Sequence, residues 1–137
     1  MSILDEHHFA RNVGGSKIDG ETVDGSAFRV RPVDADGLSG NWPEYFAGKS
    51  LAEALVEIRK AYAAKGRTIT AQSKFAILSV GGTKRSLMER GGWAIDFVHT
   101  PERLDPSHAS ITGYDPVDDI IADIIAQTVI QLLPGRE

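Results

Sequence analysis

Two histidines, His99 and His108, are nine residues apart in the last third of the sequence. His99 falls at the end of a predicted strand, on the same face as Trp93, Ile95 and Phe97, and His108 falls in the loop that follows. Because histidine titrates near neutral pH, two converging imidazoles could act as acid and base in phosphodiester cleavage without a metal. The alternative is that each histidine is a hydrogen-bonded structural residue of the long loop, since the spacing fixes no partner for either ring. Hydroxyl groups for such a site could come from Thr100, Ser107, Ser110 and Thr112.

Four basic residues could bind an anion. Arg29 and Arg31 alternate with apolar residues, so they would share one face of a strand, where two guanidinium groups can grip a phosphate or a carboxylate. Lys84 and Arg85 follow Gly81-Gly82, a glycine turn that could expose backbone donors at a helix start. The spacing is not that of a phosphate loop, so nucleotide hydrolysis is not indicated. The alternatives are solvated charges on an edge strand for the arginine pair, and an ordinary turn for the second pair.

The clearest elements that would position these residues are two helices and one strand. A helix is predicted over residues 50–65, because Ser50 and Glu53 form a capping box and apolar residues follow at helical spacing. A central strand is predicted over 74–80, which is nearly apolar on both faces. A last helix is predicted from Asp115 and Pro116 to residue 133, with an apolar stripe wider than a solvent-facing helix needs. The remaining expectations are a short helix over 1–13, strands over 27–33 and 93–100, and a long connection over 101–116.

Strands and helices alternate without a regular βαβ rhythm, which indicates a single α+β domain over residues 1–137. We expect a small, mostly antiparallel sheet with the two main helices packed on one face. The chain has no cysteine, which excludes a disulfide framework, thiolate zinc sites and a cysteine nucleophile. We predict neither a cofactor nor a metal site.

The net charge of −4 is unevenly distributed. Residues 1–58 carry −5, residues 59–90 carry +7 and residues 91–137 carry −6. The basic middle could dock an acidic partner or nucleic acid, or it could pack beside the acidic segments of its own chain. The longest apolar-rich stretch, 117–133, contains three aspartates and does not predict a membrane span. The N-terminus does not have the pattern of a signal peptide, so a cytoplasmic protein is expected.

Two stretches resemble motifs of uncharacterised small bacterial proteins. The first is residues 28–32 leading to 37–42, and the second is residues 99–101 leading to 106–111. The resemblance spans less than half of the chain and points to no named family. It implies a bacterial or phage-related origin and no particular activity.

The leading hypothesis is a non-enzymatic protein-interaction module that works as a homo-oligomer or as a component of a larger bacterial or phage-related assembly. The broad apolar surface of the last helix and the segregated charges motivate it. The alternative is a metal-independent phosphodiester-cleaving enzyme, acting for example on RNA, with His99 and His108 as the acid–base pair. In that hypothesis the anion is bound by Arg29, Arg31, Lys84 and Arg85. Nucleic-acid binding through residues 59–90 without chemistry is a third hypothesis, which the isoelectric point near 5.5 disfavours.

Overall fold

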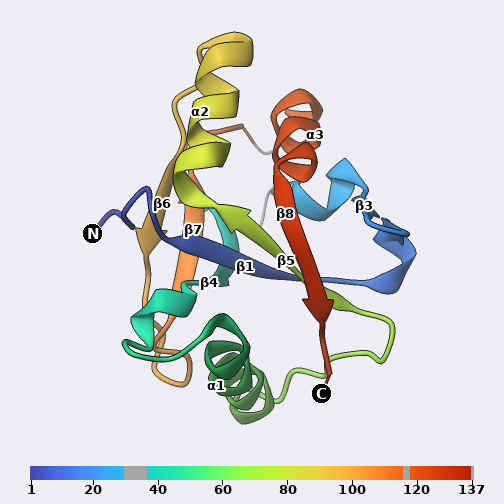
Figure 1. The fold of residues 1–137 in the computed structure, drawn as a ribbon, viewed down its shortest axis with the longest axis vertical. Helices are drawn as coiled ribbons and strands as arrows, with labels where there is room; N and C mark the ends of the chain where they lie inside the picture. The colour runs from blue at the N-terminus through green and yellow to red at the C-terminus, as the bar shows by residue number, and fades with distance from the viewer. Residues whose placement is uncertain (30–36, 116–117, 137) are drawn as a thin grey trace.

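A six-stranded antiparallel sheet forms the centre of the protein (Figure 1). The computed structural model describes residues 1–29, 37–115 and 118–136. Within these residues the strand order across the sheet is β6-β7-β4-β1-β5-β8. The α+β class and the antiparallel sheet expected from the sequence are therefore confirmed. The strands are β1 (His8–Val13), β4 (Leu38–Asn41), β5 (Lys74–Ser79), β6 (Asp96–His99), β7 (His108–Thr112) and β8 (Val129–Pro134).

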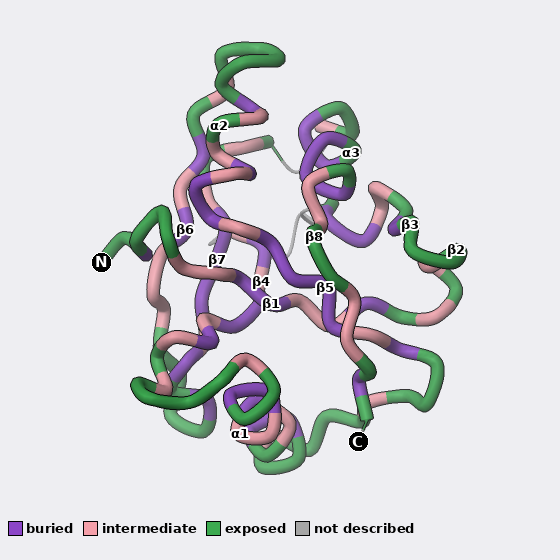
Figure 2. Tube along the Cα trace, viewed as in Figure 1, coloured by how far each residue is buried: buried purple, intermediate pink, exposed green. Residues whose placement is uncertain are grey.

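Both faces of the sheet are covered by helices, so the expectation that the main helices pack on one face is wrong. Helix α1 (Leu51–Ala64) packs Leu55 and Ile58 against one face of β1 and β5, whereas α3 (Asp119–Gln127) packs in the core on the other face. Figure 1 shows α1 on the opposite side of the sheet from α3 and α2 (Val80–Gly91). The cause lies in the central strands, because successive residues of β5 are apolar and buried on both faces. Figure 2 shows this concentration of buried residues along the middle of the sheet.

The N-terminal segment forms strand β1 and not the expected helix. Its buried residues are Phe9, Ala10 and Val13. Val13 follows Phe9 by four positions and Ala10 by three, which is also the spacing of one face of a helix. The strand lies between β4 and β5, so apolar residues are needed on both of its faces. Phe9 belongs to the core beneath α3, and Ala10 belongs to the core beneath α1.

The last predicted helix is in fact a helix followed by a strand. Helix α3 begins after the N-cap Asp118, whose carboxylate accepts a hydrogen bond from the backbone N–H of Ile121, and not after Asp115. It ends at Gln127, and Thr128 turns the chain into β8. The apolar stripe looked too wide because two periods, one helical and one of a strand, follow each other without a Gly or Pro between them.

Three other expectations change in detail. Gly25–Phe28 forms a 3-10 helix, η2, where a strand was expected over 27–33, and residues 30–36 lie outside the described part. The predicted strand over 93–100 is shorter, as β6, and the connection over 101–116 contains β7. Smaller elements are the 3-10 helices η1 (Gly15–Lys17) and η3 (Pro43–Tyr45) and the short hairpin of β2 (Ile18–Asp19) and β3 (Thr22–Val23).

The two edges of the sheet differ. Beside β6, the N-terminal residues add a short third partner: the backbone N–H of Ile3 donates to the Phe97 carbonyl at 2.8 Å, and the N–H of His99 donates to the Met1 carbonyl at 2.9 Å. Beside β8, the described residues form no corresponding ladder on the outer edge. The first edge is therefore covered by the protein's own chain, whereas the residues that the structure describes leave the second edge uncovered.

Gly40 in β4 is a position where packing leaves no room for a side chain. A Cβ added there would overlap the ring of Phe9 and lie 2.8 Å from the backbone oxygen of Ala10. Gly40→Ala is expected to lower the free energy of unfolding by about 2 kcal/mol, because the buried ring and the neighbouring strand must both shift. Urea denaturation monitored by far-UV circular dichroism measures this change.

Gly14→Ala is the matched control, because no heavy atom lies within 4 Å of the added Cβ and its φ of −63° suits any residue. Its unfolding free energy should stay within about 0.5 kcal/mol of wild type or rise slightly. Equal stability of the two variants would contradict the packing described for β1 and β4.

Candidate functional site

His99 and His108 lie at adjacent strand ends but on opposite faces of the sheet. In the pairing of β6 with β7, His99 is opposite Ala109. Directly paired residues of antiparallel strands point to the same face, and successive residues alternate. His108, one residue before Ala109, therefore faces the other way. The structure does not bring the two imidazoles together on one face as an acid–base pair would require.

His99 belongs to an aromatic cluster. Its ring centroid lies 5.1 Å from that of Trp42 and 5.5 Å from that of Tyr45. Its Nε2–H donates to the Pro106 carbonyl at 2.7 Å. On the other side of Trp42, the indole Nε1–H donates to Nδ1 of His7 at 3.1 Å. The contact of His7 with Trp42 was not predicted, although the run Trp42-Pro43-Glu44-Tyr45-Phe46 is a signal of local aromatic packing.

His108 is held in a separate polar group on the α1 face. Its Nδ1–H donates to the Thr100 carbonyl at 2.9 Å and lies at the same distance from Thr100 Oγ1. That hydroxyl is also hydrogen-bonded to Ser110 Oγ at 2.9 Å. Nε2 lies 3.8 Å from a carboxylate oxygen of Glu102. Both histidines thus bind backbone carbonyls of the segment between β6 and β7, which is the structural role that the sequence left open.

A buried polar network beneath this loop was not predicted. The carboxylate of Asp105 is fully buried and accepts hydrogen bonds from Asn41 Nδ2 at 2.8 Å and from Lys65 Nζ at 2.7 Å. Asn41 Nδ2 also donates to Ser107 Oγ at 2.9 Å. Lys65 reaches in from the C-terminal end of α1 and contacts Glu102 at 3.1 Å as well. The network joins α1 and β4 to the segment between β6 and β7, and its hydrogen bonds hold that segment in place.

The predicted anion-binding residues are dispersed. Arg29 pairs with Asp119 at 2.8 Å, and Lys84 lies 3.1 Å from Asp5 and 3.8 Å from Asp96. Arg85 is exposed on α2, and Arg31 lies outside the described residues. The Gly81-Gly82 turn is part of α2 and does not form a separate loop.

The basic segment 59–90 does not form one positive face either. It contributes the C-terminal part of α1 on one side of the sheet and α2 on the other (Figure 1). Several of its cations bind groups of this chain: Arg59 binds the carbonyls of Pro134 and Gly135, Lys65 binds Asp105, and Arg90 binds Gln127. This arrangement agrees with the interpretation that the basic middle packs beside other parts of its own chain.

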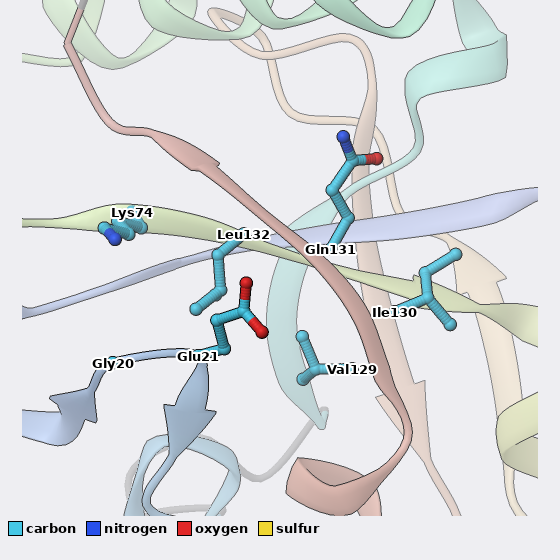
Figure 3. A pocket seen from close by; sticks show the side chains of 7 residues that line it. All are labelled: Gly20, Glu21, Lys74, Val129, Ile130, Gln131 and Leu132. Carbon is cyan, nitrogen blue, oxygen red and sulfur yellow. The ribbon is translucent and has the colours of Figure 1, made fainter.

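The outer edge of β8 is the most exposed apolar part of the sheet. Ile130 is 59% exposed, at the point where the register with β5 shifts between Ile77 and Leu78. Figure 3 shows Ile130 pointing to one side of β8, while Val129, Leu132 and Glu21 gather on the other. A hollow of about 330 Å³ lies between β8 and the β2–β3 turn. It is lined by Gly20, Glu21, Lys74, Val129, Ile130, Gln131 and Leu132.

No protein-family model, curated protein or solved structure matches this chain. Within residues 1–29, 37–115 and 118–136, no helix has the length and apolar character needed to cross a membrane.

Lys65→Met tests the buried network. Removing the ammonium leaves the Asp105 carboxylate buried without its cation, and we expect the free energy of unfolding to fall by about 3 kcal/mol at pH 7. Lys60→Met removes a lysine of the same helix that is 68% exposed and, among the described residues, pairs with Glu57, so its effect should stay below about 0.5 kcal/mol. Chemical denaturation of both variants measures the difference, and equal effects would contradict the network.

The pH dependence gives a second reading of the same variant. Burial alone would lower the pKa of Lys65, but its hydrogen bonds to Asp105 and Glu102 outweigh that effect and raise the pKa above the ordinary 10.5. A cation with a raised pKa stabilises the folded state below its unfolded pKa and ceases to do so as the pH rises through the folded pKa. The stability difference between wild type and Lys65→Met should therefore shrink above about pH 10.5. A difference that stays constant to pH 12 would contradict this assignment.

Proposed function

We propose that this protein is a non-enzymatic protein-interaction module that pairs with a second copy of itself along strand β8. The observation that carries the proposal is the contrast between the two sheet edges. At β6, the chain's own residues 1–3 bind the outward backbone groups. At β8, a six-residue strand presents its outer edge without such cover from the described residues.

The composition of β8 supports strand pairing. Exposed edges in monomeric proteins are commonly protected by lysine, by an inward-pointing charge or by a very short strand. The sequence of β8 is Val-Ile-Gln-Leu-Leu-Pro, which contains no charge. Its protection is limited to Pro134, which lacks a backbone donor, at the last position, and to the register shift at Ile130. Pairing is therefore favoured over Val129–Leu133.

The same composition favours a second copy as the partner. Two identical strands that pair antiparallel around a twofold axis place each residue opposite its counterpart or a near neighbour. Like charges in such positions would repel, and β8 has none. The exposed Ile130 of each copy would instead be removed from water.

The end of β8 is fixed in place. Arg59 of α1 donates from Nε to the Gly135 carbonyl at 2.8 Å and from Nη2 to the Pro134 carbonyl at 2.7 Å. A fixed edge strand has less conformational freedom to lose when it binds. A pair of copies joined in this way would form a continuous twelve-stranded sheet, a suitable building unit for a larger assembly.

The phosphodiesterase hypothesis receives no comparable support. It needs His99 and His108 to act on one substrate, and their register places them on opposite faces with ring nitrogens bound to Pro106 and Thr100. Of its anion-binding residues, Arg29 pairs with Asp119, Lys84 lies beside Asp5 and Asp96, and Arg85 is exposed on α2, whereas Arg31 lies outside the described residues.

Ile130→Lys tests the proposed pairing. A charge at this position would face its counterpart across the interface, and the apolar contact of Ile130 would be lost. We expect the dissociation constant of the dimer to rise at least about tenfold, which corresponds to the burial of one large aliphatic side chain. Sedimentation velocity over a range of protein concentrations measures this constant.

Ile120→Lys is the matched control, because Ile120 is 62% exposed but lies in the first turn of α3 and not on β8. It should associate like wild type. If wild type remains monomeric at about 1 mM, the proposed function is wrong. If Ile120→Lys dissociates the dimer and Ile130→Lys does not, the interface lies on α3 and the β8 assignment is wrong.

A further inference from the structure

A second hollow, of about 450 Å³, lies where β1 ends, and four of its nine described lining residues are cations. Its wall is built by the end of β1 and the following turn, by η1 and η2, and by the residues that follow η2 and α1. The described residues that line it include four cations and no carboxylate. The cations are Arg11, Lys17, Arg29 and Arg67. They come from four separate parts of the sequence, so the fold and not a sequence motif brings them together.

Arg11 is held rigidly at this hollow. It projects from β1, and its Nε donates to the Ala27 carbonyl at 2.7 Å while Nη1 donates to the Ser39 carbonyl at 2.6 Å. Both acceptors are neutral backbone groups. These bonds orient the guanidinium at the hollow, and an oriented side chain loses little freedom on binding a ligand.

Lys17 and Arg67 are positioned by uncharged partners. Lys17 Nζ donates to Ser26 Oγ at 2.8 Å, and the Arg67 guanidinium lies 5.2 Å from the centroid of the Tyr62 ring. Neither has a carboxylate partner among the residues that the structure describes. Arg29 does pair with Asp119, but both side chains are more than half exposed, so water screens that pair.

The positive charge at the hollow also affects the pKa of a neighbouring carboxyl group, that of Asp24. Asp24 caps η2, and its pKa is lowered mainly by its hydrogen bonds to Ser26 and further by the charges of Lys17 and Arg29. The hollow thus combines positive potential with fixed donors. Its volume falls within the range of roughly 300–1,000 Å³ that is usual for small-molecule sites.

We propose that this hollow binds a small molecule that carries one or two phosphate groups. Guanidinium groups match the oxygens of a phosphate in pairs, and a lysine adds a mobile point charge. The proposal does not depend on association through β8, since none of the residues that line this hollow belongs to that strand.

Pyrophosphate is the probe, titrated calorimetrically into the full chain at constant ionic strength. We expect saturable binding, with backbone amide shifts of Gly14 and Ala27 in nitrogen–proton NMR spectra. Arg67→Gln and Lys17→Gln should each weaken binding about tenfold or more, as expected for the loss of one charged hydrogen bond. Arg85→Gln, which removes an exposed cation of α2, should change it less than about twofold.

The outcomes separate the alternatives. Absence of saturable binding overturns the proposal. So does a loss of pyrophosphate affinity in Arg85→Gln as large as that in Arg67→Gln and Lys17→Gln, because it would show that only the overall charge of the protein attracts the anion. Citrate binding as tightly as pyrophosphate would overturn the preference for phosphate. Displacement of pyrophosphate by a twenty-nucleotide single strand that binds more tightly would identify nucleic acid as the ligand and overturn the small-molecule assignment. Thermal unfolding confirms that the variants fold, and if Arg67→Gln does not, Lys17→Gln decides the test.

Discussion

The backbone N–H and C=O groups at the edges of the six-stranded sheet must be hydrogen-bonded within the chain, to water or to a partner, and this constraint determines what each edge can bind. At β6 the requirement is met within the chain, where residues 1–3 bind Phe97 and His99. At β8 the strand is uncharged, its end is held by Arg59, and its most exposed side chain is Ile130. Water can satisfy such an edge, but a second copy can satisfy it and also bury the apolar side chains. The interaction hypothesis, first drawn from the apolar stretch at 117–133, thus acquires a specific location.

The register of the same sheet decides what the histidines can do. A shift of one residue between β6 and β7 would place His99 and His108 on the same face, because the side-chain period of a strand is two. In the register observed, His99 stacks on Trp42 and Tyr45, while His108 joins Thr100 and Ser110. The buried Asp105–Lys65 pair lies under the same loop. These contacts hold the loop between β6 and β7 in one conformation. The outer edge of β8 and the basic hollow at the end of β1 remain as exposed features that could bind a partner or a ligand.

Local signals in the sequence predicted the elements that depend on local interactions. The capping box at Ser50 and Glu53 correctly predicted α1, and the continuous apolar run correctly predicted β5. The strands β1 and β8 were missed because their apolar spacing also fits a helix and only pairing with β5 makes them strands. The Asn41–Asp105 contact joins residues 64 positions apart, and the cations of the basic hollow come from four separate segments. No pattern in one sequence specifies such contacts, since they depend on which strands become neighbours.

Hydrogen–deuterium exchange of the β8 amides at several protein concentrations is a direct test of pairing along β8, because it follows the backbone groups that the pairing would bind. If β8 pairs with a second copy, amides within Val129–Leu133 exchange more slowly as the concentration rises, whereas those of β6, already bordered by residues 1–3, exchange at a constant rate. Exchange of the β8 amides that does not depend on concentration up to about 1 mM would contradict pairing along this strand.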